Sequence, residues 1–366
     1  MSIKSVAINT GGGDAPGLNA VIRSAVLAAI NRGWKCYGIR DGYHGILIPE
    51  LYPDGGIMDL TKDRVRGITH LGGTILGTTN RGNPLHFPVH QPDGSYMEIN
   101  RIDELISKFK NHGIDALLAI GGDGSLTIAN AFVERGFPVV GVPKTIDNDL
   151  FGTEVTFGFD SAVSFATECI DRLHSTAESH HRVMIVEVMG RYAGWIALHA
   201  GVAGTADAIL IPEIPYNIEK IAQKVMEREQ IGRHFSIIVV AEGAKPADGD
   251  VSIIGKSIGQ AERLGGAGER VAKQIEKLTG KETRVVVLGH LLRGGTPTTF
   301  DRLLSLRFGT AAVRALAAGE TGVMVGLDCS EIRCVPFSDV AGKMRGVPVH
   351  SDTILTARDL GITFGD

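Results

Sequence analysis

Short apolar runs punctuate the chain, and each is followed at once by a loop rich in glycine or in charged residues. The runs are SVAIN, DALLAI, PVVGV, RVMIVEV, DAILI, FSIIVVA and TRVVVLG. A strand that is apolar along its whole length is buried on both faces, which is typical of parallel sheets covered by helices. Longer stretches with helical spacing, such as residues 20–29 and 218–226, separate the runs. The alternation predicts an α/β architecture.

Composition restricts what the protein can bind. The chain has 366 residues, which favours two domains, and a formal net charge of −4, which gives no electrostatic basis for binding nucleic acid or an anionic membrane. No apolar stretch approaches the roughly 20 residues that span a bilayer, and the first residues lack the pattern of a cleavable signal peptide. The cysteines are scattered, which favours reduced thiols: Cys36, Cys169, Cys329 and Cys334. We therefore expect a cytoplasmic protein.

Two glycine-rich loops follow predicted strands and precede predicted helices, TGGGDAPG at residues 10–17 and IGGDGS at residues 120–125. Glycine lets backbone N–H groups converge on an anion, and the N-terminus of the following helix adds a partial positive charge. Two such loops predict a polyphosphate ligand. The carboxylate of Asp123 would repel phosphate unless it binds a cation, so Asp123 is a candidate Mg²⁺ ligand. The alternative is that the glycines serve only tight strand-to-helix turns.

The region from residue 244 to 266 is the best candidate for a long mobile loop. It contains GKS at residues 255–257, but a P-loop would require glycine at the position of Asp250. TGGGDAPG likewise lacks the Gly-x-Gly-x-x-Gly spacing of dinucleotide-binding loops. The sequence therefore argues against both of these common nucleotide-binding motifs.

The segment PKTIDND, residues 143–149, follows another predicted strand and places Lys144 and Thr145 beside two carboxylates, Asp147 and Asp149. A carboxylate near phosphates can act as a general base that takes a proton from an attacking hydroxyl, while its neighbour serves Mg²⁺. The alternative is that Asn and Asp only form a turn here.

Arginines recur at the ends of predicted strands, and the guanidinium group is a preferred partner of phosphate. They are Arg182, Arg191, Arg284 and Arg293. Any single one could equally be a surface or ion-pair residue. Because the net charge is negative, a phosphorylated ligand requires such a local concentration, and the set of four favours one.

Eight motifs together resemble the 6-phosphofructokinase family. They are GGGDAPGLNAVIR, GGTILGTTNRG, IGGDGS, PKTIDND, GFDSA, SHHRVMIVEVMGRYAGW, PEIP and ETRVVVLGHLLRGGTPTTFDR. They follow the family's order from about residue 5 to 317. The resemblance implies two Rossmann-like three-layer α/β/α domains with mostly parallel sheets. It also implies the glycolytic transfer of the γ-phosphoryl group of ATP to the 1-hydroxyl of fructose 6-phosphate, giving fructose 1,6-bisphosphate.

The same resemblance implies roles for individual residues. Asp147 would be the general base, Thr145 and Arg191 would stabilise the transferring group, and Asp123 with Asp149 would hold Mg²⁺. The residues expected at the nucleotide phosphates are Gly12, Arg81, Gly122, Gly124, Ser125 and Lys144. The residues expected at the sugar phosphate are Thr145, Asp147, Met189, Gly190, Arg191, Glu242, His290 and Arg293.

Arg182 and Arg284 match residues that family members contribute from a neighbouring subunit. This implies a homo-oligomer, dimer or tetramer, with shared active sites.

The ATP and Mg²⁺ domain is expected over residues 1–158 and about 290–340. The sugar-phosphate domain is expected over residues 159–289 and about 341–366.

The resemblance allows two phosphoryl donors, ATP and pyrophosphate. Pyrophosphate-using relatives resemble this chain in having lysine at the position of Lys144, but they usually have aspartate at the position of Gly124, where a carboxylate would crowd and repel ATP. Glycine therefore favours ATP, and a reversible pyrophosphate-dependent phosphofructokinase is the alternative. From other classes, a non-catalytic nucleotide sensor on the same fold and a kinase of another small molecule also stay open, although the pair Asp147 and Asp149 argues against a sensor.

Overall fold

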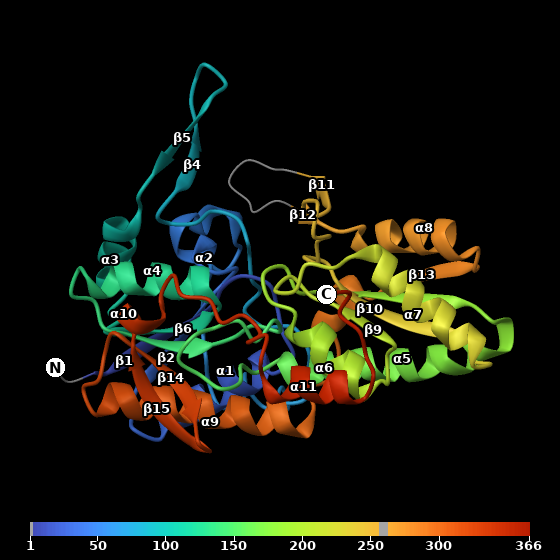
Figure 1. The fold of residues 1–366 in the computed structure, drawn as a ribbon. Coiled ribbons are helices and arrows are strands. Elements are labelled where there is room, and N and C mark those ends of the chain that lie inside the picture. The colour runs from blue at the N-terminus through green and yellow to red at the C-terminus, as the bar shows by residue number, and fades with distance from the viewer. Residues whose placement is uncertain (1–2, 256–262) are drawn as a thin grey trace. The chain divides into compact units, whose positions relative to one another are not determined.

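The computed structural model describes residues 3–255 and 263–366, and the chain forms two compact units (Figure 1). The first unit consists of Met1–Thr145, Leu150–Gly158 and Arg293–Met344. The second consists of Ile146–Asp149, Phe159–Leu292 and Arg345–Asp366. The segment 146–149 packs with the second unit, whereas the expected domain ranges had placed it in the first.

A seven-stranded sheet forms the centre of the first unit, in the order β15-β14-β7-β6-β1-β2-β3. Its strands are β1 (Ser5–Thr10), β2 (Lys35–Ile39), β3 (Ile57–Asp59), β6 (Ala116–Gly121), β7 (Val139–Pro143), β14 (Val323–Asp328) and β15 (Glu331–Pro336). The inner neighbours run parallel, and only β3 and β15, at the two edges, pair antiparallel. The predicted mostly parallel sheet is confirmed.

Helices cover both faces of this sheet, because consecutive strand residues point to opposite sides. On one face Ile8 and Leu118 pack with α1 (Leu18–Ile30) and α9 (Thr299–Ala317). On the other face their neighbours in the strands pack with the remaining helices of the unit. These are α2 (His44–Leu47), α3 (Ile102–Asn111), α4 (Asp123–Val133) and α10 (Phe337–Val340), and the exposed 3₁₀ helix η1 (Pro49–Leu51) follows α2. The unit is therefore a three-layer α/β/α sandwich.

The second unit repeats the design around a four-stranded, fully parallel sheet in the order β13-β8-β10-β9. Its strands are β8 (Val183–Val188), β9 (Ala208–Leu210), β10 (Ser236–Ala241) and β13 (Thr283–Val287). One face packs on α7 (Ile218–Gln230) and α8 (Ala267–Thr279), and α5 (Phe159–His180) and α6 (Trp195–Ala203) contact the same strands. The 3₁₀ helix η2 (Gly289–Arg293) and α11 (Asp352–Asp359) are the remaining described helices. Every strand-like run named above is a strand, so the α/β class is confirmed.

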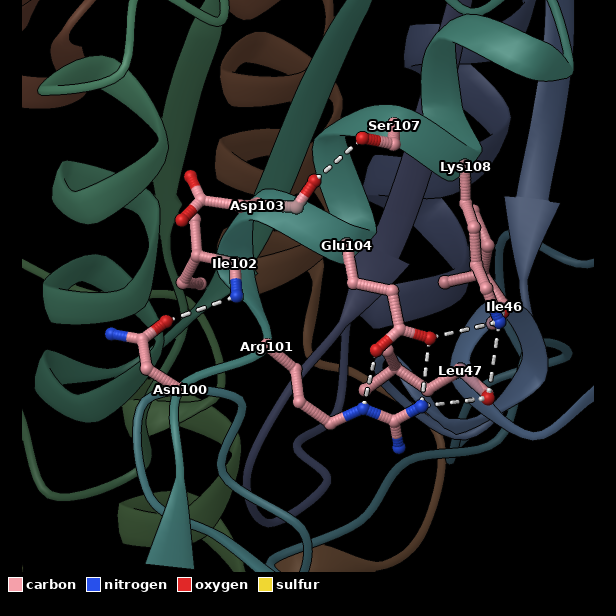
Figure 2. A network of polar contacts seen from close by, with 9 residues as sticks. All are labelled: Ile46, Leu47, Asn100, Arg101, Ile102, Asp103, Glu104, Ser107 and Lys108. Atoms are coloured by element: carbon pink, nitrogen blue, oxygen red, sulfur yellow. Dashed lines mark hydrogen bonds and ion pairs between the residues drawn. The ribbon is translucent and has the colours of Figure 1, made fainter.

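An antiparallel hairpin of β4 (Phe87–His90) and β5 (Tyr96–Ile99) extends away from the sheet of the first unit (Figure 1). Its base is anchored at α3, where the Arg101 guanidinium lies 4.6 Å from the Phe87 ring. Figure 2 shows the same arginine paired with Glu104 at 2.7 Å, and Lys108 donating to the carbonyl of Ile46 at 3.0 Å. Lys108 therefore connects α3 with α2, and Arg101 connects the start of α3 with the hairpin.

Part of the expected mobile loop at 244–266 has regular structure. Strands β11 (Ile253–Gly255) and β12 (Arg263–Leu264) pair antiparallel, and residues 256–262, including most of GKS, lie outside the described residues. Within residues 3–255 and 263–366, no helix combines the length and apolarity needed to cross a membrane.

Candidate functional site

Three loops of the first unit meet at one edge of its sheet, because β1, β6 and β7 are parallel neighbours whose carboxyl ends lie together. The N–H of Gly11 donates to the carbonyl of Ile120 at 2.9 Å. The N–H of Lys144 donates to the carbonyl of Gly121 at 3.0 Å. The structure thus brings together both glycine-rich loops and the start of the PKTIDND segment.

Helix α4 begins at this edge directly after Gly122, which has no side-chain capping bond, so the first-turn N–H groups face the loops with the positive end of the helix dipole. Ser125 lies in the first turn, and a Cβ at Gly11 would come within 2.5 Å of its Oγ. A Cβ at Gly124 would meet no atom within 4 Å. The surface beside Gly124 is therefore open, as an anion site on a helix N-terminus requires.

Lys144 lies inside this cluster of loops and is only 3% exposed. Its ammonium group donates to the carbonyl of Gly13. A Cβ at Gly12, which has a φ of 75°, would lie 3.5 Å from Nζ of Lys144. The first glycine loop therefore contacts a buried lysine ammonium on its inner side.

Asp123, the predicted Mg²⁺ ligand, is the first residue of α4 and is half-buried. Its Oδ1 accepts the N–H of Gly342 at 2.8 Å. This contact orients the carboxyl group and leaves its second oxygen with acceptor capacity. A hard carboxylate oxygen beside candidate phosphate sites fits the ligand preference of Mg²⁺.

The segment around residues 74–81 contacts the first glycine loop. Arg81 is the only residue of this segment that the sequence predicted as a site residue. The hydroxyl of Thr78 donates to the carbonyls of Thr10 and Gly12, the former at 3.1 Å. Asn80 Oδ1 would be 3.9 Å from a Cβ on Gly12. Arg81 is the next residue and is exposed. The glycines of LGTTNRG were the available signal for Thr78 and Asn80, since they mark another loop able to approach a ligand closely.

The carboxylates of Asp147 and Asp149 belong to the second unit and are half-buried, whereas Ile146 and Asn148 are buried. Asn148 has a φ of 52°, in the left-handed region that asparagine tolerates better than most residues. The preceding residue, Thr145, belongs to the first unit, where its carbonyl accepts the hydroxyl of Thr156 at 2.7 Å. The PKTIDND segment therefore carries its lysine in one unit and its carboxylates in the other.

The predicted sugar-phosphate residues Met189, Gly190, Arg191 and Glu242 come together at the carboxyl ends of the parallel neighbours β8 and β10. The N–H of Glu242 donates to the carbonyl of Val188 at 2.9 Å, next to Met189. Gly190 has a φ of 140°, and a Cβ there would lie 2.7 Å from the carbonyl of Ala193, so the turn requires glycine. The half-buried side chains of Arg191 and Glu242 thus occupy adjoining loops.

His290 and Arg293 lie in η2 after β13 but fall in different units. His290 is exposed and follows the edge strand of the second sheet. Arg293 packs in the first unit, where Nη1 donates to the carbonyl of Asp14 at 3.0 Å. Arg293 therefore lies against the first glycine loop.

Arg182 and Arg284 lie toward the amino ends of the strands of the second sheet, whereas Arg191 follows a carboxyl end. The four arginines therefore do not form one phosphate-binding cluster within one copy. Arg182 directly precedes β8, a strand of six residues that is about 20 Å long at roughly 3.3 Å per residue. Arg284 is the second residue of β13, where it pairs with Met184 near the amino end of β8. Both pair with Glu282, Arg182 at 2.9 Å. The hydrogen bond from Arg182 is the largest cause that holds the pKa of the Glu282 carboxyl below its usual value. Within one copy, these two arginines therefore lie together beside Glu282, toward the end of the sheet opposite to Glu242.

Comparison with known proteins identifies the family. The sequence profile described as phosphofructokinase matches residues 5–316. The ATP-dependent 6-phosphofructokinase of Chloroflexus aurantiacus is 53% identical over 364 residues, which cover 99% of this chain and 98% of that protein. The ATP-dependent 6-phosphofructokinase 2 of Clostridium perfringens is 47% identical over 369 residues, covering 100% and 99% of the two chains.

Solved structures agree with this result. Phosphofructokinase of Pichia pastoris in the T-state superimposes with a TM-score of 0.76 at 32% identity over 92% of this chain, which spans only 35% of that longer chain. A pyrophosphate-dependent phosphofructokinase from Marinobacter aquaeolei shares the fold, with a TM-score of 0.80 at 24% identity over 98% of this chain and 91% of that one. The chain belongs to the phosphofructokinase family.

Proposed function

We propose that this protein is an ATP-dependent 6-phosphofructokinase, which transfers the γ-phosphoryl group of ATP to the 1-hydroxyl of fructose 6-phosphate. The observation that carries the proposal is the convergence of two glycine loops, the N-terminus of α4 and Lys144, in a chain 53% identical over nearly its full length to a protein named for this activity. The open surface at Gly124 supports ATP over pyrophosphate as the donor. The isolated cysteines support a cytoplasmic location.

In this proposal the first unit binds the donor. The backbone N–H groups near Gly12, Gly122 and Ser125 and the ammonium of Lys144 offset the charge of the phosphates. Asp123 would hold Mg²⁺ through its carboxylate, and Asp149, which belongs to the second unit, would contribute a second carboxylate. When bound, Mg²⁺ neutralises phosphate charge during transfer.

The second unit binds the acceptor. Asp147 takes the proton of the sugar 1-hydroxyl, and the guanidinium of Arg191 stabilises the charge on the transferring group together with the hydroxyl of Thr145. Glu242 and the loop at Met189 and Gly190 would orient the sugar. The adjoining positions of these loops at one sheet edge support this assignment.

Arg182 and Arg284 are proposed to bind the sugar phosphate held by another copy of the chain. Their place toward the amino ends of β8 and β13 supports a shared site, because within one copy they lie away from Glu242, Arg182 by about 20 Å along β8. The protein would then act as a homo-oligomer, dimer or tetramer.

The test is a coupled assay with fructose 6-phosphate and either ATP or pyrophosphate as sole donor. We expect turnover with ATP and Mg²⁺. Turnover with pyrophosphate alone would instead establish the pyrophosphate-dependent activity. Turnover of an unphosphorylated acceptor but not of fructose 6-phosphate would show another kinase, and ATP binding without turnover of any acceptor would show a sensor.

A substitution tests the proposed base. Asp147→Ser should lower kcat at least about 100-fold while the affinity for fructose 6-phosphate changes little, because the serine removes the proton acceptor but not the sugar contacts. Steady-state kinetics and equilibrium binding of the sugar measure both quantities. Near-normal turnover of the variant would remove Asp147 from the mechanism.

A further inference from the structure

Residues 345–347, here called the C-terminal strap, lie against the 146–149 segment within the second unit. The N–H of Arg345 donates to the carbonyl of Asp149 at 2.8 Å. The guanidinium of Arg345 donates to the carbonyl of Asn148, from Nη2 at 3.1 Å and from Nε at 3.3 Å. One residue therefore holds the two peptide carbonyls that follow Asp147.

The C-terminal strap is itself fixed to the start of α6. Nε1 of Trp195 donates to the carbonyl of Arg345 at 2.9 Å, and the guanidinium carbon lies 4.9 Å from the centre of the Trp195 ring. Glu213 accepts the N–H of Val347 at 2.7 Å and that of Gly194 at 3.1 Å. Trp195 and Gly194 directly follow the loop that carries Arg191. The strap thus connects the segment of Asp147 with the loop of Arg191.

The 146–149 segment needs such support because of its backbone conformation. Asn148 has a φ of 52° and is 3% exposed. A non-glycine residue in the left-handed region costs free energy, and it persists where surrounding contacts determine the conformation. Because Asp147 is bonded to Asn148, the direction of its carboxylate depends on that conformation being held.

We propose that Arg345 is a positioning residue for phosphoryl transfer, which holds the backbone of Asn148 and Asp149 so that the Asp147 carboxylate meets the sugar hydroxyl. The inference rests on the proposed function, since it takes Asp147 as the base. Arg345 lies outside every motif that indicated the activity. A misplacement of the base by about 1 Å is enough to cost about 100-fold in rate.

The test compares Arg345→Ala and Arg345→Lys with a matched control, Arg358→Ala. Arg358 lies in α11 of the same unit, pairs with Asp366, and lies 5.1 Å from the centre of the Phe364 ring, so its removal also deletes a polar contact of the guanidinium and a ring contact. The measurements are kcat, KM for each substrate, thermal unfolding, and amide hydrogen exchange of the peptide spanning residues 143–158.

For Arg345→Ala we expect kcat to fall about 30- to 100-fold, with KM for ATP within about twofold of the wild type. Arg345→Lys should lose about tenfold, because one flexible ammonium does not replace a planar donor pair. Millimolar guanidinium ion should restore part of the kcat of the alanine variant. Amides at residues 148 and 149 should exchange faster in Arg345→Ala and not in Arg358→Ala.

A kcat within about threefold of wild type in both Arg345 variants would overturn the inference. If the alanine variant does not fold, the lysine variant decides, and wild-type kcat there would overturn it. A wild-type protein that turns over no donor would contradict the proposed function separately. The exchange data distinguish the two failures, since unchanged exchange at residues 148 and 149 in Arg345→Ala would show that Arg345 does not hold this segment and would overturn the inference whatever the activity.

Discussion

Replacing Gly124 with aspartate tests where the donor phosphates bind. Gly124 lies in the first turn of α4, and a Cβ there meets no atom within 4 Å, so the substitution requires no repacking. A carboxylate in the first turn of a helix stabilises it by about 0.3–1 kcal/mol. We therefore expect the thermal unfolding of Gly124→Asp without ligand to be unchanged or slightly raised, so that any loss of function comes from the ligand.

The expected loss follows from Coulomb's law. A carboxylate about 5 Å from one phosphate charge, at an effective dielectric constant of about 20, is repelled by about 3 kcal/mol. This corresponds to a loss of more than about 100-fold in affinity for ATP. The repulsion should decrease at high salt, although less than for an exposed pair.

The assay measures Kd for ATP with Mg²⁺ and the KM for ATP, with Gly124→Asn as the control. Asparagine has the shape of aspartate without its charge, so the difference between the two variants isolates the repulsion. We expect Gly124→Asp to bind ATP at least about 100-fold more weakly than wild type, and Gly124→Asn less than about tenfold more weakly. Equal affinity in the two variants would refute the placement of phosphates beside the first turn of α4.

Three further results follow from the same account. Chelation of Mg²⁺ should abolish turnover, and added Mg²⁺ should restore it, whereas turnover in excess chelator would contradict the role given to Asp123. Inactive Asp147→Ser and Arg284→Ala proteins, dissociated and reassembled together, should recover about a quarter of wild-type activity, because hybrid pairs contain one intact shared site; no recovery in verified hybrids would count against shared sites. Burial, and next the positive charge of Arg345, lower the pKa of His199. Its neutral form therefore stabilises the fold above the unfolded pKa of about 6.5, and that stability is lost as pH falls below this value. The fall in Tm between about pH 7 and 5 should be smaller in His199→Gln than in wild type. The same change of Tm with pH in both proteins would show that His199 does not contribute.

Most of the central strands could be predicted, because a strand that is buried on both faces appears in the sequence as a continuous apolar run. Strands such as β6 and β10 are buried at every position and almost wholly apolar, since helices cover both faces of their sheets. The edge strands β3 and β15 were missed because edge positions are partly exposed and polar residues interrupt the pattern. Strand β14 is as apolar as the strands that were found, and the same rule applied to VMVGLD would have included it.

Part of the candidate site could also be predicted from the sequence, and part could not. The loops after β1, β6 and β7 were predictable, because the carboxyl ends of parallel neighbours meet. The separation of Arg182 and Arg284 from the other arginines was missed, because strand ends were grouped without regard to strand direction. The role of Arg345 could not be predicted from one sequence. Its contact with Asn148 joins residues 197 positions apart and depends on the packing of the C-terminal strap.

A crystal structure with a non-hydrolysable ATP analogue, Mg²⁺ and fructose 6-phosphate tests the account most directly. We expect the donor phosphates against residues 11–14 and 122–125, Mg²⁺ at the carboxylate of Asp123, and the sugar 1-hydroxyl within hydrogen-bonding distance of Asp147. Phosphates bound away from both glycine loops, or a 1-hydroxyl out of reach of Asp147, would contradict it.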